Sequence, residues 1–133
     1  MQSSGGMLRI NVVHGKLTKD VDAFGKQDPY VKITYMGTPY KTKVHEGGGK
    51  HPVWNETFDI SIGSTGDDIL FEVKDKDVVG VKMIGSTIIK TSSLCIHGGV
   101  RDYFSIHDKE GEPVGSILFE AKFTPHSEIS KNI

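Results

Sequence analysis

The sequence has a single cysteine, Cys95, so no disulfide bond can form within the chain. A chain with one free thiol is typical of a reducing compartment, and we therefore expect a cytoplasmic protein. The sequence also has no apolar run of the ~18–20 residues that a membrane span needs. Any contact with a membrane is therefore expected to be reversible.

The sequence also has no large excess of positive or negative charge. The 16 basic and 17 acidic side chains leave a formal net charge of −1. A partner attracted by charge must therefore be held by a local cluster rather than by the field of the whole molecule. Aromatic residues make up only 8% of the chain, and a nucleic-acid partner is not expected. The histidines are scattered, and we find no nucleophile with a base and an orienting group, so we do not expect an enzyme.

No window of helical length carries a clean apolar stripe, and strand patterns dominate instead. The alternating or β-branched segments are residues 8–13, 30–35, 40–44, 54–62, 69–73, 83–89, 100–106 and 116–123. Glycine-containing turns separate them, and a short helix is expected near residues 92–96. Many short strands at this spacing predict an all-β sandwich or barrel. We expect one domain over residues 8–124, preceded by a flexible leader or added remnant (1–7) and followed by a tail (125–133).

Two predicted loops, residues 18–27 and 74–82, are longer than ordinary hairpin turns, and loops of that length often carry function. Both loops carry a pair of aspartates. Asp22 and Asp28 flank the first loop, and Asp75 and Asp77 lie at the start of the second. A single aspartate in a loop is more often a turn residue. Two matched loops favour Ca²⁺, which takes 6–8 oxygen ligands in flexible geometry.

Three ordered motifs give the sequence a specific family resemblance. Residues 22–32, DAFGKQDPYVK, resemble the D-x-x-G-K-x-D-P-Y-V signature of C2 domains, and residues 51–58, HPVWNETF, resemble their N-P-x-W-N-E-x-F strand entry. Residues 71–77, FEVKDKD, followed by Ile-Gly at 84–85, resemble their third loop. The likeness covers residues 8–123 and is greatest to small stand-alone C2 proteins of the plant elicitor-responsive kind.

The resemblance implies an eight-stranded antiparallel Greek-key β-sandwich, and the strand order favours the circularly permuted, phospholipase-like variant. It also implies that Asp22, Asp28, Asp75 and Asp77 are Ca²⁺ ligands. C2 domains usually have a further aspartate before the Ile-Gly pair, where this chain has Lys82 and Met83. Fewer ligand charges weaken Ca²⁺ binding. We therefore expect one weakly to moderately bound Ca²⁺ ion.

Apolar residues lie between the aspartates at the predicted loop tips. They are Phe24 in the first loop and Val78, Val79 and Val81 in the second. Exposed apolar tips are unfavourable in water unless they meet an apolar partner, so they are candidates for insertion into a membrane once Ca²⁺ has neutralised the carboxylates. The alternative, that these side chains cap the end of the core, has equal weight.

A lysine cluster follows the second and third predicted strands. Its members are Lys32, Lys41 and Lys43, and similar lysines in protein kinase C domains bind phosphoinositide headgroups. Alternate lysines also protect exposed strands, so a solvated face is an equally good interpretation. The sequence thus predicts a non-catalytic module for Ca²⁺-dependent binding to anionic phospholipid membranes. The alternative is a Ca²⁺-independent scaffold that binds phosphoinositides or protein partners.

Overall fold

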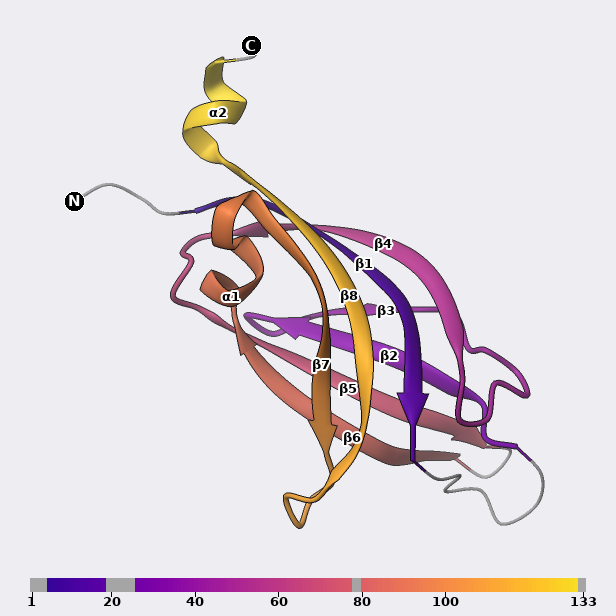
Figure 1. Cartoon of the computed structure of the whole chain (residues 1–133). Helices are drawn as coiled ribbons and strands as arrows, with labels where there is room; N and C mark the ends of the chain where they lie inside the picture. The colour runs from indigo at the N-terminus through magenta and orange to yellow at the C-terminus, as the bar shows by residue number, and fades with distance from the viewer. Residues whose placement is uncertain (1–4, 19–25, 78–79, 132–133) are drawn as a thin grey trace.

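A computed structural model of the chain describes residues 5–18, 26–77 and 80–131, and it is dominated by eight strands (Figure 1). The elements are β1 (Gly6–Leu17), β2 (Pro29–Tyr35), β3 (Thr38–Lys41), β4 (Val53–Ile62), β5 (Asp68–Asp77), β6 (Gly80–Lys90), α1 (Thr91–Cys95), η1 (Ile96–Gly98), β7 (Gly99–His107), β8 (Pro113–Pro125) and α2 (His126–Lys131). All strand pairs are antiparallel. The predicted all-β class and eight-strand count are confirmed, and the permuted connectivity stays a prediction.

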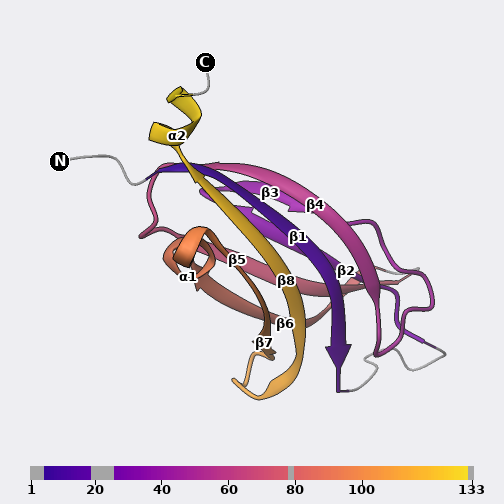
Figure 2. The same ribbon diagram turned by 45° about the horizontal axis from the view of Figure 1, so that its top comes forward.

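The strands follow the order β3-β2-β5-β6-β7-β8-β1-β4 in one nearly closed sheet. The link between β6 and β7 is a single residue pair, Ser86 opposite His107, so the sheet divides there into two layers of four strands. Figure 2 shows these layers, with β3-β2-β5-β6 lying across from β7-β8-β1-β4. The architecture is therefore a sandwich that is continuous along one side.

The core lies between the two layers and follows the period-2 alternation of the strands. Ile10 on β1, Ile33 on β2 and Phe119 on β8 are fully buried, as inward-facing strand residues should be. The rings of Phe71 on β5 and Phe119 on β8 lie 4.6 Å apart, centroid to centroid. These strands are not neighbours in the sheet, so this contact ties one layer to the other.

The second predicted loop is largely strand in the structure. β5 continues to Asp77 and β6 begins at Gly80, with Lys76 opposite Val81 and Asp75 opposite Lys82. The sequence did not indicate this because charged residues on both faces of the strand hide the apolar alternation. Residues 74–77 and 80–82 therefore form a paired extension of the β5–β6 hairpin, and Asp75 and Asp77 lie on a strand.

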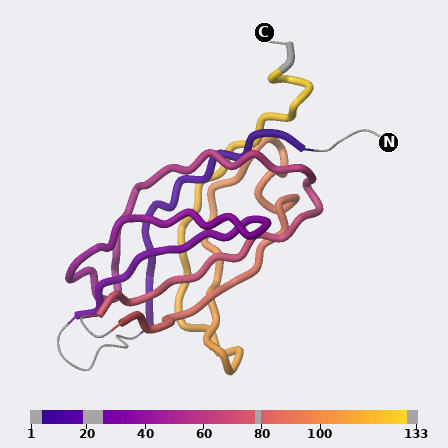
Figure 3. The backbone as a smooth tube through the Cα atoms, turned by 180° about the vertical axis from the view of Figure 1, so that it is seen from behind, coloured from indigo at the N-terminus to yellow at the C-terminus, as the bar shows by residue number. Residues whose placement is uncertain are grey.

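The sandwich has two distinct ends. α2 and the beginning of β1 lie at one of them, and the β5–β6 hairpin extension lies toward the other (Figure 1). Seen from behind (Figure 3), the β2–β3 hairpin lies in front of β7 and β8, so the lysine-bearing strands belong to the layer opposite these two strands. No helix in the described part of the chain is long and apolar enough to cross a bilayer.

Candidate functional site

The aspartates that the structure describes meet where β2 begins and β5 ends. Asp28 immediately precedes β2, and Pro29 lies opposite Asp75 in the register of β2 with β5. Asp77 follows Asp75 by two residues on the same strand, so the two side chains project to the same side. Asp22 lies outside the described residues. Three of the four predicted ligands thus belong to one end of the sandwich, which we call the aspartate end (Asp28, Asp75 and Asp77).

Asp75 is the anchor of the aspartate end. Its side chain is fully buried, and its Oδ1 accepts a hydrogen bond from the backbone N–H of Asp28 at 2.7 Å. The N–H of Lys76 in turn donates to the backbone carbonyl of Asp28 at 3.0 Å. A buried carboxylate is stable only when hydrogen bonds or charge compensate for lost hydration. The chain immediately before β2 is therefore held firmly against β5.

Asp28 belongs to the same network but is only half-buried. Its Oδ1 accepts a hydrogen bond from the N–H of Gly47 at 2.7 Å, which fixes the loop that follows β3. A hollow of about 190 Å³ lies beside it, lined by Asp28, Val44, Glu46, Lys76 and Asp77. Carboxylate oxygens from three segments of the chain therefore border one small space.

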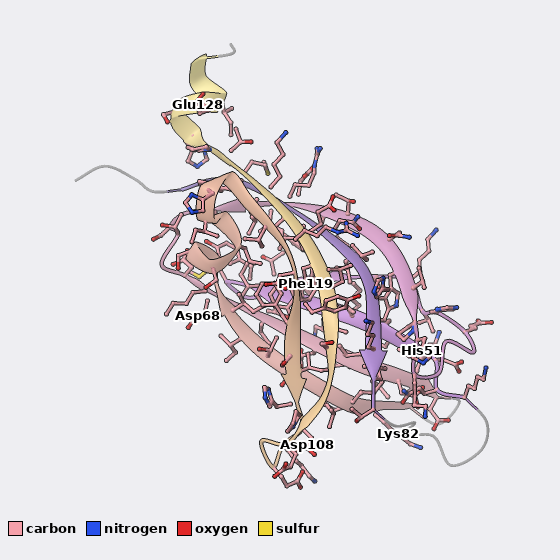
Figure 4. The ribbon with its side chains drawn as sticks, in the orientation of Figure 1. His51, Asp68, Lys82, Asp108, Phe119 and Glu128 are labelled. Atoms are coloured by element: carbon pink, nitrogen blue, oxygen red, sulfur yellow. The ribbon has the colours of Figure 1, made fainter. Side chains whose placement is uncertain are left out.

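Asp77 forms an ion pair with a lysine. The ammonium Nζ of Lys82 lies 3.3 Å from Asp77 Oδ2, with the Asp77 side chain 16% exposed and the Lys82 side chain 44% exposed. Figure 4 shows Lys82 at the same end of the molecule as His51, far from Asp68 and Glu128. Lys82, one of the two residues found where a further aspartate is expected, thus contacts one of the predicted Ca²⁺ ligands directly.

The donor chemistry of this end fits Ca²⁺ better than a soft metal. Its candidate ligands are carboxylates, and the Lys82 ammonium already shows that a cation can sit against Asp77. Among residues 5–18, 26–77 and 80–131, no three histidine, cysteine, aspartate or glutamate side chains lie close enough to hold a metal ion. A Ca²⁺ site here therefore depends on Asp22 or on rearrangement of the described carboxylates.

Of the predicted membrane tips, the structure describes Val81 alone. Its side chain is 54% exposed on β6, so it does not cap the core. Phe24, Val78 and Val79 lie outside the described residues. Met83, two residues further along β6, is 48% exposed. One strand therefore presents two apolar side chains to solvent on either side of Lys82.

The predicted lysine cluster lies on β2 and on β3 with the residues that follow it, at the edge of the β3-β2-β5-β6 layer. Lys32 on β2 is directly opposite Lys41 on β3, and on its other side it faces Glu72 of β5. Opposite residues in neighbouring antiparallel strands share a face. β3 ends at Lys41, but Thr42 is buried and bonded to Val31, so exposure still alternates through to Lys43. We call Lys32, Lys41 and Lys43 the lysine face.

Three residues with a place in this region were not among the predicted site residues. Glu46 lines the hollow beside Asp28, Met83 adds apolar surface next to Val81, and Lys74 lies within 4.0 Å of Glu72. The alternation of lysine with aspartate over residues 74–77 was a usable signal for Lys74. Glu46 carried no comparable signal, because its position depends on how the loop after β3 folds back onto Asp28.

The motif around Trp54 has a structural role. The indole Nε1–H of Trp54 donates to the carbonyl of Pro29 at 3.0 Å, and Glu56 Oε2 accepts the N–H of Lys43 at 2.7 Å. Both contacts join β4 to the segments that carry Asp28 and the lysine face. β4 therefore positions the candidate site from the other layer without forming part of it.

Two antiparallel layers with aspartates gathered at one end are the features of a known class of small β-sandwich domains. The family model described as the C2 domain matches residues 6–106, and the chain belongs to this family. The resemblance of the three sequence motifs is thereby confirmed.

Several Arabidopsis thaliana proteins are similar in sequence. Synaptotagmin-4 is 31% identical over 122 residues, which are 90% of this chain and 21% of the relative. Phospholipase D gamma 1 is 29% identical over 101 residues, 74% of this chain and 12% of the relative. The chain thus spans a small fraction of both. The 16 kDa phloem protein 2 is similar over nearly its whole length, at 28% identity covering 96% of this chain and 88% of the relative.

Solved structures agree on the fold. A C2 domain-containing protein from a putative elicitor-responsive gene superposes with a TM-score of 0.77 at 29% identity, covering 94% of this chain and 93% of the other. A C2 domain of plant Extended Synaptotagmin 1 superposes with a TM-score of 0.78 at 22% identity, covering 94% and 98%. The second likeness concerns the fold alone.

Proposed function

We propose that this C2 domain binds anionic phospholipid membranes reversibly and that Ca²⁺ at the aspartate end promotes the binding. The observation that carries the proposal is that the exposed Val81 of β6 lies at the aspartate end, opposite Lys76 and next to Gly80, the residue opposite Asp77. Carboxylates repel an anionic surface, whereas exposed apolar side chains favour its interfacial zone. The two features act together only if a cation neutralises the carboxylates.

In this proposal Asp22, Asp28, Asp75 and Asp77 supply carboxylate oxygens to a single ion. Bound Ca²⁺ would add positive charge that attracts lipid phosphate. Asp75 also holds the backbone of Asp28 through the 2.7 Å hydrogen bond, so the ligand segment is positioned before any ion arrives. The apolar tips, Phe24, Val78, Val79 and Val81, then enter the interfacial zone.

The proposed role is non-catalytic and cytoplasmic, with recruitment to membranes on demand. The relatives named as phospholipases D match this chain over only a small share of their length, so their catalysis need not lie in the matched part. Their names and that of synaptotagmin support a module that works at lipid surfaces. A nucleic-acid partner forms no part of the proposal.

Sedimentation with vesicles of phosphatidylserine and phosphatidylcholine, in Ca²⁺ or in a chelator, tests this function. We expect Ca²⁺ to increase the bound fraction, and Asp77→Asn to weaken the increase because a ligand charge is lost. Asp68→Asn is the matched control, since Asp68 forms an ion pair with Lys90 at the other end of the same hairpin. Equal binding with and without Ca²⁺ would contradict the proposed Ca²⁺ dependence.

A second candidate function is Ca²⁺-independent binding of phosphoinositides or protein partners through the lysine face. The observation that favours it is the placement of Lys32 directly opposite Lys41, which brings two positive charges together on an outer strand pair. Two like charges at this spacing are mutually unfavourable. An anionic headgroup or an acidic protein segment would relieve the repulsion without any metal ion.

A further inference from the structure

Both ends of the β5–β6 hairpin carry an aspartate on β5 paired with a lysine on β6. At one end Lys90 Nζ lies 3.1 Å from Asp68 Oδ1, and both side chains are well exposed, at 62% and 59%. At the other end Lys82 Nζ lies 3.3 Å from Asp77 Oδ2, and the Asp77 side chain is only 16% exposed. The second pair is more shielded from water, so its attraction is screened less.

Lys82 lies near Asp75 as well as Asp77. Lys82 lies directly opposite Asp75 in the register of β5 with β6, whereas Asp77 lies opposite Gly80. The ammonium therefore contacts Asp77 from a backbone position beside the fully buried Asp75. Its charge therefore lies against a carboxylate of the aspartate end, although the Lys82 side chain remains 44% exposed.

We propose that Lys82 is an internal counter-ion of the aspartate end, which a bound Ca²⁺ ion must displace from Asp77. The inference rests on the proposed function only in taking Ca²⁺ as the ion that enters. Ca²⁺ and the ammonium compete for Asp77 Oδ2, and a unit positive charge also repels the divalent ion. Lys82 therefore lowers Ca²⁺ affinity and leaves the aspartate end partly neutralised when Ca²⁺ is scarce.

Calorimetric titration of the purified chain with Ca²⁺, without lipid, tests the role of Lys82. Lys82→Gln should bind Ca²⁺ about tenfold more tightly, because a unit charge about 6 Å from a divalent ion opposes it by roughly that factor even in water. Lys82→Arg keeps the charge and should bind Ca²⁺ as weakly as the native chain. Lys90→Gln is the matched control, with the same loss of charge and of an ion pair on the same strand, and its affinity should be unchanged.

The outcomes separate this inference from the proposed function. If native chain and Lys82→Gln bind Ca²⁺ equally well, Lys82 is not a counter-ion, although Ca²⁺-promoted membrane binding can still stand. If only Lys82→Gln binds Ca²⁺, the inference is upheld and the proposed Ca²⁺ dependence of the native chain is lost. If neither binds Ca²⁺, both ideas fail. An equal gain in Lys90→Gln would show a general effect of charge and overturn the specific role of Lys82.

Discussion

Burial decides the chemistry of single side chains in this protein, and Asp75 and Cys95 show it in opposite ways. Asp75 is fully buried and accepts the N–H of Asp28, so hydrogen bonding accompanies its loss of hydration. Cys95, at the end of α1, packs half-buried against the apolar core, and this burial raises the pKa of its thiol to about 11. Burial therefore holds the Asp75 carboxylate in one position, and it lowers the fraction of Cys95 that is present as the reactive thiolate.

Cys95 yields a prediction on pH. Its pKa rises from 9.0 to about 11 in the folded chain, so the folded state holds the proton more tightly. This contribution to stability is fully present below pH 9 and is lost as the pH rises through about 11. At pH 8 we expect a thiol reagent to react about a hundredfold more slowly than with the urea-unfolded chain, because only the thiolate reacts.

Reaction with an aromatic disulfide reagent, followed by absorbance, measures the rate at Cys95. Cys95→Ser is the blank, since the chain has no other cysteine. Similar rates for the folded and unfolded chains at pH 8 would show that burial does not protect the thiol.

At the scale of elements, the joint between β6 and β7 sets the shape of the sandwich. The two strands share only the pair Ser86 with His107, and Gly85 lies immediately beside it. A Cβ atom at Gly85 would lie 2.5 Å from Val114 Cγ2 and 3.2 Å from the carbonyl oxygen of His107. The glycine is therefore needed for close approach of the two layers, which gives a physical reason for the Ile-Gly pair of the third motif.

Gly85→Ala should lower the free energy of unfolding by about 1–3 kcal/mol, as overpacking of a closed core does. Urea unfolding followed by the fluorescence of Trp54, the only tryptophan, measures the loss. Adding Val114→Ala removes the nearest atom, so the double variant should lose less than the sum of the two single variants. Strict additivity, or an unchanged midpoint for Gly85→Ala, would contradict the proposed clash.

At the scale of the whole molecule, a net charge of −1 conceals an uneven distribution. The aspartate end gathers carboxylates where β2 begins and β5 ends, while the lysine face presents Lys32 beside Lys41 on β2 and β3. The proposed binding to a membrane with anionic lipid can therefore use two different surfaces. Under the proposed function, Ca²⁺ concentration would set the contribution of the aspartate end, and ionic strength would affect the lysine face more.

Lys32→Gln with Lys41→Gln should weaken chelator-resistant binding to anionic vesicles by about 2 kcal/mol, since each lysine near such a surface contributes ~1 kcal/mol. The matched control is Lys90→Gln with Lys109→Gln, which removes the same charge from other exposed positions. Vesicle sedimentation in a chelator at two salt concentrations measures the effect. An equal loss in both double variants would indicate an unspecific contribution of charge, and no loss would leave the lysine face as a solvated surface.

The sequence by itself determined the class of fold, because period-2 alternation and turn residues are local signals that the strands retain. It also determined the family, since the motifs at residues 22–32, 51–58 and 71–77 depend on residue order alone. Tertiary structure decided that residues 74–77 extend a strand, that Glu46 comes beside Asp28, and that the Lys82 ammonium contacts Asp77. These facts depend on pairing between segments distant in the chain, and no local pattern encodes the distance between two side chains on different strands.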